Sequence, residues 1–265
     1  MALNVFLMYT LFYRHDLPFP VGICSLFNCA CLTLGYPRII TIVALVVLEI
    51  LYILEIGAMW CSLLLFLIAV VILTIEESNG SPSENGILSL VFFAQFLAYF
   101  LNKFNLSKSL SKNRMQFSAQ IFAAGYVLAG ISKLHVSGLA WFTTDAPNFA
   151  LEVMRNFNSK YITYGNIWYY NRGIEIADFV LNHIIITKIL LGFSVMLELC
   201  AFVLMLGKRL SFVYSFLLLF LHVGIYLTLD IIFPSITVPL IIFFINPLYW
   251  ILIVAEALYQ KMSFT

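Results

Sequence analysis

The longest apolar run in the chain, residues 39–75, constrains the fold more than any other feature. A helix needs about 20 residues to cross the hydrocarbon core of a bilayer, so this run is nearly long enough for two spans. Within it, an acidic residue and a glycine occur together only at Glu55 and Gly57. We therefore predict two helices that are joined by a tight turn at these residues.

The composition extends this prediction to the whole chain of 265 residues, of which 63% are hydrophobic and 10% are charged. Soluble domains are about 45–50% apolar and about 25% charged, so no soluble fold could bury this much apolar surface. We predict an all-α, multi-pass integral membrane bundle that forms a single transmembrane domain over residues 1–265. About eight spans are expected, at 18–36, the two halves of 39–75, 87–101, 116–134, 183–206, 211–230 and 236–258.

The charge balance limits the partners that the chain could have. The formal net charge is +1, which gives no excess of positive charge for binding nucleic acid. The expected partners are the lipid bilayer and a small peptide or lipid-soluble substrate, and the oligomeric state is left open. Five scattered cysteines favour a packing role over a disulfide framework or a metal site, although the Cys29–Cys31 pair leaves a redox role open.

Residues 135–182 form a long segment that mixes aromatic and charged residues and therefore suits the membrane interface. Within it, apolar residues recur at near-helical spacing over 139–157, which favours a helix lying flat on the bilayer over an ordinary loop. The expected apolar positions are Leu139, Phe142, Phe149, Val153, Met154 and Phe157.

The distribution of lysine and arginine predicts the orientation, because short basic loops stay on the cytoplasmic side. Lys103, Lys108, Lys112 and Arg114 place the loop before the fifth span inside. The segment 135–182 then lies outside, and Lys208 and Arg209 return inside. Both termini are expected to be cytoplasmic, and Arg38 is the one residue that disagrees. No basic residue or cleavage site marks the N-terminus as a signal peptide.

Ionisable residues within predicted spans are candidates for function, because each costs about 2.5–3.5 kcal/mol to insert. Lys133 ends the fifth span, and a poorly hydrated lysine can act as a neutral base, whereas one that snorkels to the headgroups has no such role. Glu198 and His222 lie at similar depths in neighbouring spans, so a pair between them would serve as structural glue or as a proton relay. The remaining ionisable candidates are Glu49, Glu55, Lys188 and Asp230.

Other polar side chains in the predicted spans more commonly serve packing between helices than a function of their own. Gln95, Gln116 and Gln120 could hydrogen-bond across the bundle, and Tyr126 lies between Gly125 and Gly130 in a region suited to close packing. The sequence contains no catalytic-triad spacing, phosphate-binding loop or histidine-rich metal cluster, so no metal site is predicted.

Two segments resemble the horizontally transferred transmembrane (HTTM) domain family, whose best-known members are vitamin K-dependent gamma-carboxylases. The first is AAGYVLAGISKLHVSGLAWF, which contains Lys133, and the second is LHVGIYLTLDIIF, which contains His222. The resemblance covers residues 116–245 in the family's order. It implies that Lys133 occupies the place of a catalytic lysine that deprotonates vitamin K hydroquinone at the non-cytoplasmic face, and that His222 occupies the place of the family's helix-borne histidine.

The resemblance has limits that affect the expected reaction. Carboxylases of the family have a large soluble C-terminal region for docking a protein substrate, whereas this chain ends soon after its last predicted span. Carboxylation of a propeptide-bearing substrate is therefore not expected. The motif AGxxKL also occurs in DoxX-like membrane proteins.

The leading hypothesis is a carboxylase-like (lyase) membrane enzyme that acts on a quinol or modifies a small peptide. Its catalytic residues would be Lys133, His222 and Glu198, and its substrate-binding residues would be Trp141, Gln120 and Tyr126. An enzyme predicts that these side chains converge on one site. The alternatives are a DoxX-like redox partner, or a non-catalytic transporter or assembly partner, of which a transporter predicts inverted repeats and a helix broken in mid-membrane.

Overall fold

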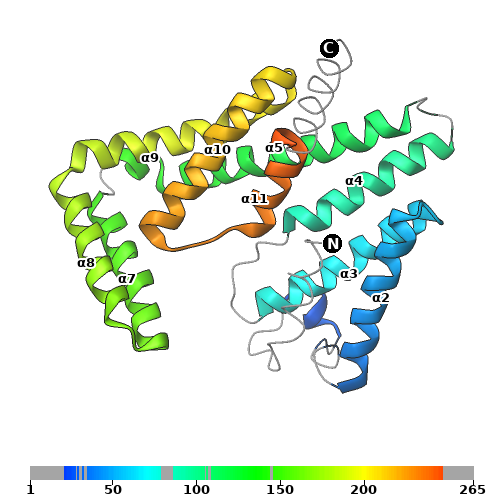
Figure 1. Cartoon of the computed structure of the whole chain (residues 1–265), viewed down its shortest axis with the longest axis horizontal. Coiled ribbons are helices and arrows are strands. Elements are labelled where there is room, and N and C mark those ends of the chain that lie inside the picture. The colour runs from blue at the N-terminus through cyan, green and yellow to red at the C-terminus, as the bar shows by residue number, and fades with distance from the viewer. Residues whose placement is uncertain are drawn as a thin grey trace, which may run out of the picture. The chain divides into compact units, whose positions relative to one another are not determined.

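A computed structural model describes residues 21–27, 29, 32, 35–78, 86–104, 106, 109–143 and 146–246 (Figure 1). These residues are helical and include no strand, which confirms the all-α class. Five helices in this part of the chain are long and apolar enough to cross a membrane. They are α2 (Gly35–Ile53), α3 (Ala58–Ser78), α4 (Gly86–Lys103), α5 (Leu110–Ser137) and α10 (Lys208–Leu229).

The predicted break in the apolar run is confirmed. α2 ends at Ile53 and α3 begins at Ala58, and the turn between them contains Glu55 and Gly57 at φ values of 59° and 61°. Glycine adopts this left-handed conformation without steric cost, whereas Glu55 does so at some cost in backbone energy. The turn therefore reverses the chain within four residues, as the sequence indicated.

The chain divides into two compact units, residues 1–122 and 123–265, and α5 contributes to both. In the first unit, α2, α3 and α4 pack around a core that includes Leu45, Leu65 and Ile72. Cys24 and Cys29 lie in this core, in agreement with their expected packing role. The prediction of a single domain over residues 1–265 stays a prediction.

In the second unit, α7 (Ala146–Tyr164) and α8 (Ile167–Asn182) lie side by side as a helical hairpin (Figure 1). Gly165, at φ 66°, makes the turn, and the Asn166 side chain accepts a hydrogen bond from the backbone N–H of Trp168 at 2.9 Å, which caps α8. Val153 and Phe157, which the sequence placed on the lipid-facing side of an interfacial helix, are instead buried inside the hairpin with Ile176 and Val180. Their helical spacing serves packing between two helices.

A sharp corner follows the hairpin. α9 (Ile184–Leu199) leaves α8 at an angle of 97°, and together they form a sixth candidate span only if this bent pair counts as one. α9 and the 3₁₀ helix η3 (Ala201–Met205) occupy the predicted span 183–206. After α10 come α11 (Pro234–Leu240) and a π-helical turn, η4 (Ile241–Ile245). Much of the predicted spans 18–36 and 236–258 lies outside the described residues.

Candidate functional site

Lys133 and Glu198 form an ion pair between α5 and α9. The Lys133 ammonium donates hydrogen bonds to both carboxylate oxygens of Glu198, at 2.5 and 2.7 Å. The Glu198 side chain is only 7% exposed and that of Lys133 is 27% exposed. The two opposite charges therefore meet in a poorly hydrated site, where their mutual attraction is stronger than it would be in water.

Gly130 allows α9 to come this close to α5. A Cβ atom at Gly130 would lie 3.1 Å from the Leu199 side chain and 3.2 Å from the Cβ of Glu198. The absent side chain therefore creates the space in which Glu198 reaches Lys133, one helical turn further along α5.

Trp141 joins this pair from the short helix α6 (Ala140–Thr143). The Lys133 nitrogen lies 5.5 Å from the centroid of the Trp141 ring, within the range of a cation–π interaction. The Trp141 Nε1 atom is buried and has no hydrogen-bond partner among the described residues. Buried N–H groups are nearly always paired, so this nitrogen is a candidate donor to a bound molecule.

A second polar pair lies between α5 and α10. The Tyr126 hydroxyl and the His222 Nε2 atom are 2.7 Å apart, and both side chains are buried. The other ring nitrogen, Nδ1, is buried without a partner in the part of the chain that the structure describes. Tyr126 and Lys133 lie about two helical turns apart on α5, so the two pairs share this helix. We call these five residues the Lys133 cluster: Tyr126, Lys133, Trp141, Glu198 and His222.

The structure pairs the predicted site residues differently from the sequence-based expectation. A pair between Glu198 and His222 was one possibility from the sequence; in the structure Glu198 contacts Lys133 and His222 contacts Tyr126. Gln120 is exposed and lies on the part of α5 that belongs to the first unit. Its assignment as a substrate-binding residue stays a prediction. Lys188 is half-buried on α9.

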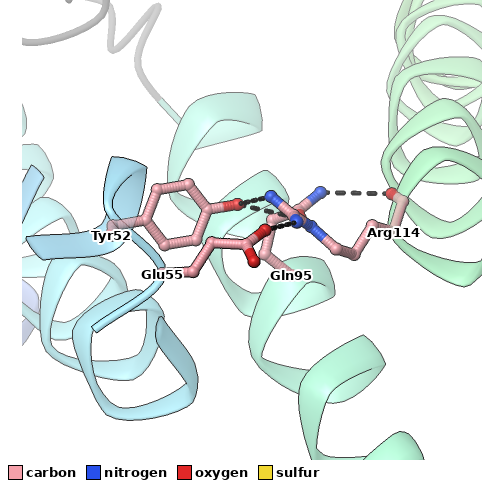
Figure 2. Close-up of polar contacts among 4 residues, drawn as sticks. All are labelled: Tyr52, Glu55, Gln95 and Arg114. Carbon is pink, nitrogen blue, oxygen red and sulfur yellow. Dashed lines mark hydrogen bonds and ion pairs between the residues drawn. The ribbon is translucent and has the colours of Figure 1, made fainter. Parts of the chain in front are cut away.

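The first unit contains a polar cluster that the sequence did not single out, centred on Arg114 at the start of α5. Figure 2 shows its guanidinium between Tyr52 and Glu55 from the α2 end of the unit and Gln95 of α4. Nε donates to the Gln95 side-chain oxygen at 2.9 Å, one terminal nitrogen to the Tyr52 hydroxyl at 2.9 Å, and the other to Glu55 at 3.2 Å. Gln95 in turn donates to the Arg114 carbonyl oxygen and to Ser118.

Two tyrosine rings flank this guanidinium. The central carbon of the Arg114 guanidinium lies 5.5 Å from the Tyr52 ring centroid and 5.0 Å from that of Tyr99. Arg114 therefore ties together α2, α4 and α5 through hydrogen bonds and cation–π contacts. The sequence had assigned this arginine to a basic loop. Its position just before an apolar run, together with Glu55 and Gln95 as polar interruptions of other spans, was the available signal.

No protein-family model, curated protein or solved structure compared with this chain matches it. Among the residues that the structure describes, no group of three or more His, Cys, Asp or Glu side chains could hold a metal ion. The fold defines the class of protein: an all-α, multi-pass membrane protein, with a polar cluster in each of its two units.

Proposed function

We propose that the chain is a membrane-embedded acid–base enzyme that deprotonates a lipid-soluble quinol, as its resemblance to the HTTM family implies. The observation that carries this proposal is the buried Lys133–Glu198 pair, in the same unit as two buried ring nitrogens, Trp141 Nε1 and His222 Nδ1, that have no partner within the described residues. These two nitrogens could each form a hydrogen bond with one oxygen of a ring that carries two oxygens, while the charged pair exchanges a proton with it. Vitamin K hydroquinone, or another quinol, has this chemistry.

Lys133 would act as the base after it has lost a proton to its own partner. Because both Glu198 oxygens accept from the ammonium, the proton has a short path to the carboxylate. Its transfer leaves a neutral amine and a carboxylic acid and creates no net charge, so the low-dielectric surroundings do not oppose it. The Lys133 amine then accepts the proton of a substrate hydroxyl: the O–H bond breaks and an N–H bond forms.

The other residues of the Lys133 cluster would orient the substrate and balance charge. His222 Nδ1 and Trp141 Nε1, which have no partner within the described residues, would hydrogen-bond to substrate oxygens. Tyr126 holds the other edge of the imidazole ring and so fixes its direction. The resulting ammonium of Lys133 would stabilise the negative charge that develops on the substrate oxygen.

The test uses purified protein in proteoliposomes with vitamin K hydroquinone as the probe. An ionised quinol reacts with dissolved oxygen faster than a neutral one, so the wild-type protein should accelerate oxygen uptake. Lys133→Met and Glu198→Gln should abolish the acceleration, while Lys188→Met, which replaces a half-buried lysine of α9, should retain it. Unchanged oxygen uptake by a folded Lys133→Met variant would exclude the catalytic role.

A transporter is the second candidate, because the buried Lys133–Glu198 pair could also pass a proton across the bilayer. A transporter would move protons across proteoliposomes in the absence of quinol, as a trapped pH-sensitive dye would report, and Lys133→Met would stop this flux. Proton flux without quinol-dependent oxygen uptake would favour this second function.

A further inference from the structure

The corner at residue 183 sets the direction of the α7–α8 hairpin relative to the membrane. α9 has 16 residues and η3 has five. At a rise of 1.5 Å per residue in α9 and 2.0 Å in η3 they extend about 34 Å, enough for a hydrocarbon core of about 30 Å. α9 and η3 can therefore cross the bilayer without any contribution from α8. Because α8 leaves α9 at 97° (Figure 1), an α9 that crosses the bilayer along its normal would leave α8 nearly parallel to the membrane plane.

The outer surface of α7 has an apolar side and a polar side. Its buried face is formed by Ala150, Val153 and Phe157. Successive residues of an α-helix are about 100° apart, so sequence neighbours on the outer surface lie on different flanks. Leu151 and Ile162, which are 67% and 81% exposed, share one flank. The residues that follow them, Glu152 and Thr163, are exposed on the other flank.

α8 repeats this division. Ile167, Tyr170 and Leu181 are exposed on one side of its buried face, and Arg172 and Glu175, which form an ion pair at 3.1 Å, lie on the other. Asp178 is exposed at the edge of the apolar side, next to Ile167 in its direction around the helix axis. Two aromatic residues, Trp168 and Phe179, share the polar side, where Phe179 stacks on His183 at 4.4 Å between ring centroids.

The apolar flanks of the two helices lie on the same side of the hairpin. The rings of Tyr161 and Tyr170, which border the two flanks, are 5.8 Å apart between centroids. The hairpin is therefore amphipathic as a unit. We call its apolar side the lipid flank, and its members are Leu151, Tyr161, Ile162, Ile167, Tyr170 and Leu181.

We propose that the α7–α8 hairpin lies on the membrane surface with its lipid flank buried at the boundary between headgroups and acyl chains. α9, which follows the hairpin, also exposes apolar side chains, such as Ile185, Ile189 and Phe193, and lipid is expected to cover these in a spanning helix. Tyrosine prefers this boundary because its ring is apolar and its hydroxyl is polar. Arg172 and Glu175 lie on the opposite flank, and Arg155, at the edge of the lipid flank beside Ile162, would extend its charge to the headgroups.

The hairpin is also held at a fixed position relative to the spanning helix α10. Lys160 of α7 donates hydrogen bonds to the backbone carbonyl and the carboxylate of Asp230, which ends α10. A rigid connection of this kind keeps one flank turned toward the lipid. The inference does not depend on the proposed chemistry at Lys133.

Spin labels on two pairs of sequence neighbours test this inference in proteoliposomes. One label at a time is attached to Leu151→Cys, Glu152→Cys, Ile162→Cys or Thr163→Cys after replacement of the native cysteines. Labels at 151 and 162 should collide mainly with oxygen, which concentrates in lipid, and labels at 152 and 163 mainly with a water-soluble nickel complex. The preference should reverse between neighbours in both pairs.

A photocrosslinking amino acid at the same four positions gives a second measurement that keeps the native cysteines. Positions 151 and 162 should yield adducts with the mass of a phospholipid, and positions 152 and 163 should not. Labels that all prefer the nickel complex would overturn the inference. So would labels at 151 and 162 that are shielded from both reagents and crosslink to protein, since a second copy or another chain would then cover the lipid flank.

Discussion

Lys133 and Glu198 depend on each other, so removing one should cost more than removing both. Lys133→Met leaves a carboxylate that is 7% exposed without its partner, and breaking a buried pair costs about 3–5 kcal/mol. Partial exposure of Lys133 reduces this figure, and we expect a loss of about 2–3 kcal/mol in the free energy of unfolding. The double variant Lys133→Met/Glu198→Gln should recover at least half of the loss.

Denaturant titration in bicelles provides the measurement, and Lys188→Met is the matched control because it changes the same residue type on α9. A double variant that is as unstable as the sum of the two single variants would show that the two side chains are not coupled in the folded protein.

Arg114 should matter for stability more than an exposed arginine does. Arg114→Gln removes the donors to Tyr52, Glu55 and Gln95 and the cation–π contacts, so we expect a loss of about 1–3 kcal/mol in the free energy of unfolding. The control is Arg155→Gln, whose side chain is 79% exposed and pairs with Glu152 at 3.4 Å. This exposed pair should contribute below about 1 kcal/mol. Equal effects of the two substitutions would contradict the structural role of Arg114.

At the residue scale, the sequence identifies chemically notable side chains but not their partners. Lys133, Glu198 and His222 stand out because charged or polar groups are rare in spans. Which of them meet depends on the rotation and tilt of α5, α9 and α10, which hydropathy does not specify. Arg114 was missed for the same reason, since it counts as a loop residue until α2 and α4 are placed beside it.

At the scale of elements, Gly173 determines how closely the two helices of the hairpin approach. A Cβ atom there would lie 2.8 Å from the Cβ of Phe157, so Gly173→Ala must push the helices apart. We expect a loss of about 1–3 kcal/mol in local stability, seen as faster amide hydrogen exchange in α7 and α8. Gly224→Ala on α10 has nothing within 4 Å of its new Cβ and should be neutral or stabilising by up to about 1 kcal/mol. Unchanged exchange in Gly173→Ala would refute the close approach.

The helices themselves were easier to predict from the sequence than the way in which they pack against one another. The turn at Glu55 and Gly57 was recognisable because it interrupts an apolar run, and α10 because its apolar run is continuous. The hairpin was not predicted, because apolar residues at helical spacing look the same whether they face lipid or a second helix. Val153 and Phe157 face α8, and only the tertiary structure distinguishes the two cases.

At the scale of the whole molecule, the orientation in the membrane stays a prediction that one experiment can test. Lys112→Cys lies in the first turn of α5 and should react with an impermeant thiol reagent from the cytoplasmic side. Glu152→Cys, on the polar side of the hairpin, should react from the opposite side. Right-side-out and inside-out vesicles distinguish the two. Labelling of both positions from the same side would overturn the orientation derived from the basic loops.

The pairing of Lys133 with Glu198 has a consequence for how the chain enters the membrane. The two residues are 65 positions apart, so the ribosome delivers α5 to the translocon well before α9 has been synthesised. An unpaired lysine at the centre of the bilayer costs about 2.5–3.5 kcal/mol, and Lys133, near the end of α5, bears a smaller cost until its acidic partner arrives. The stable insertion of α5 in the bilayer is therefore expected only after α9 has been synthesised, late in biogenesis.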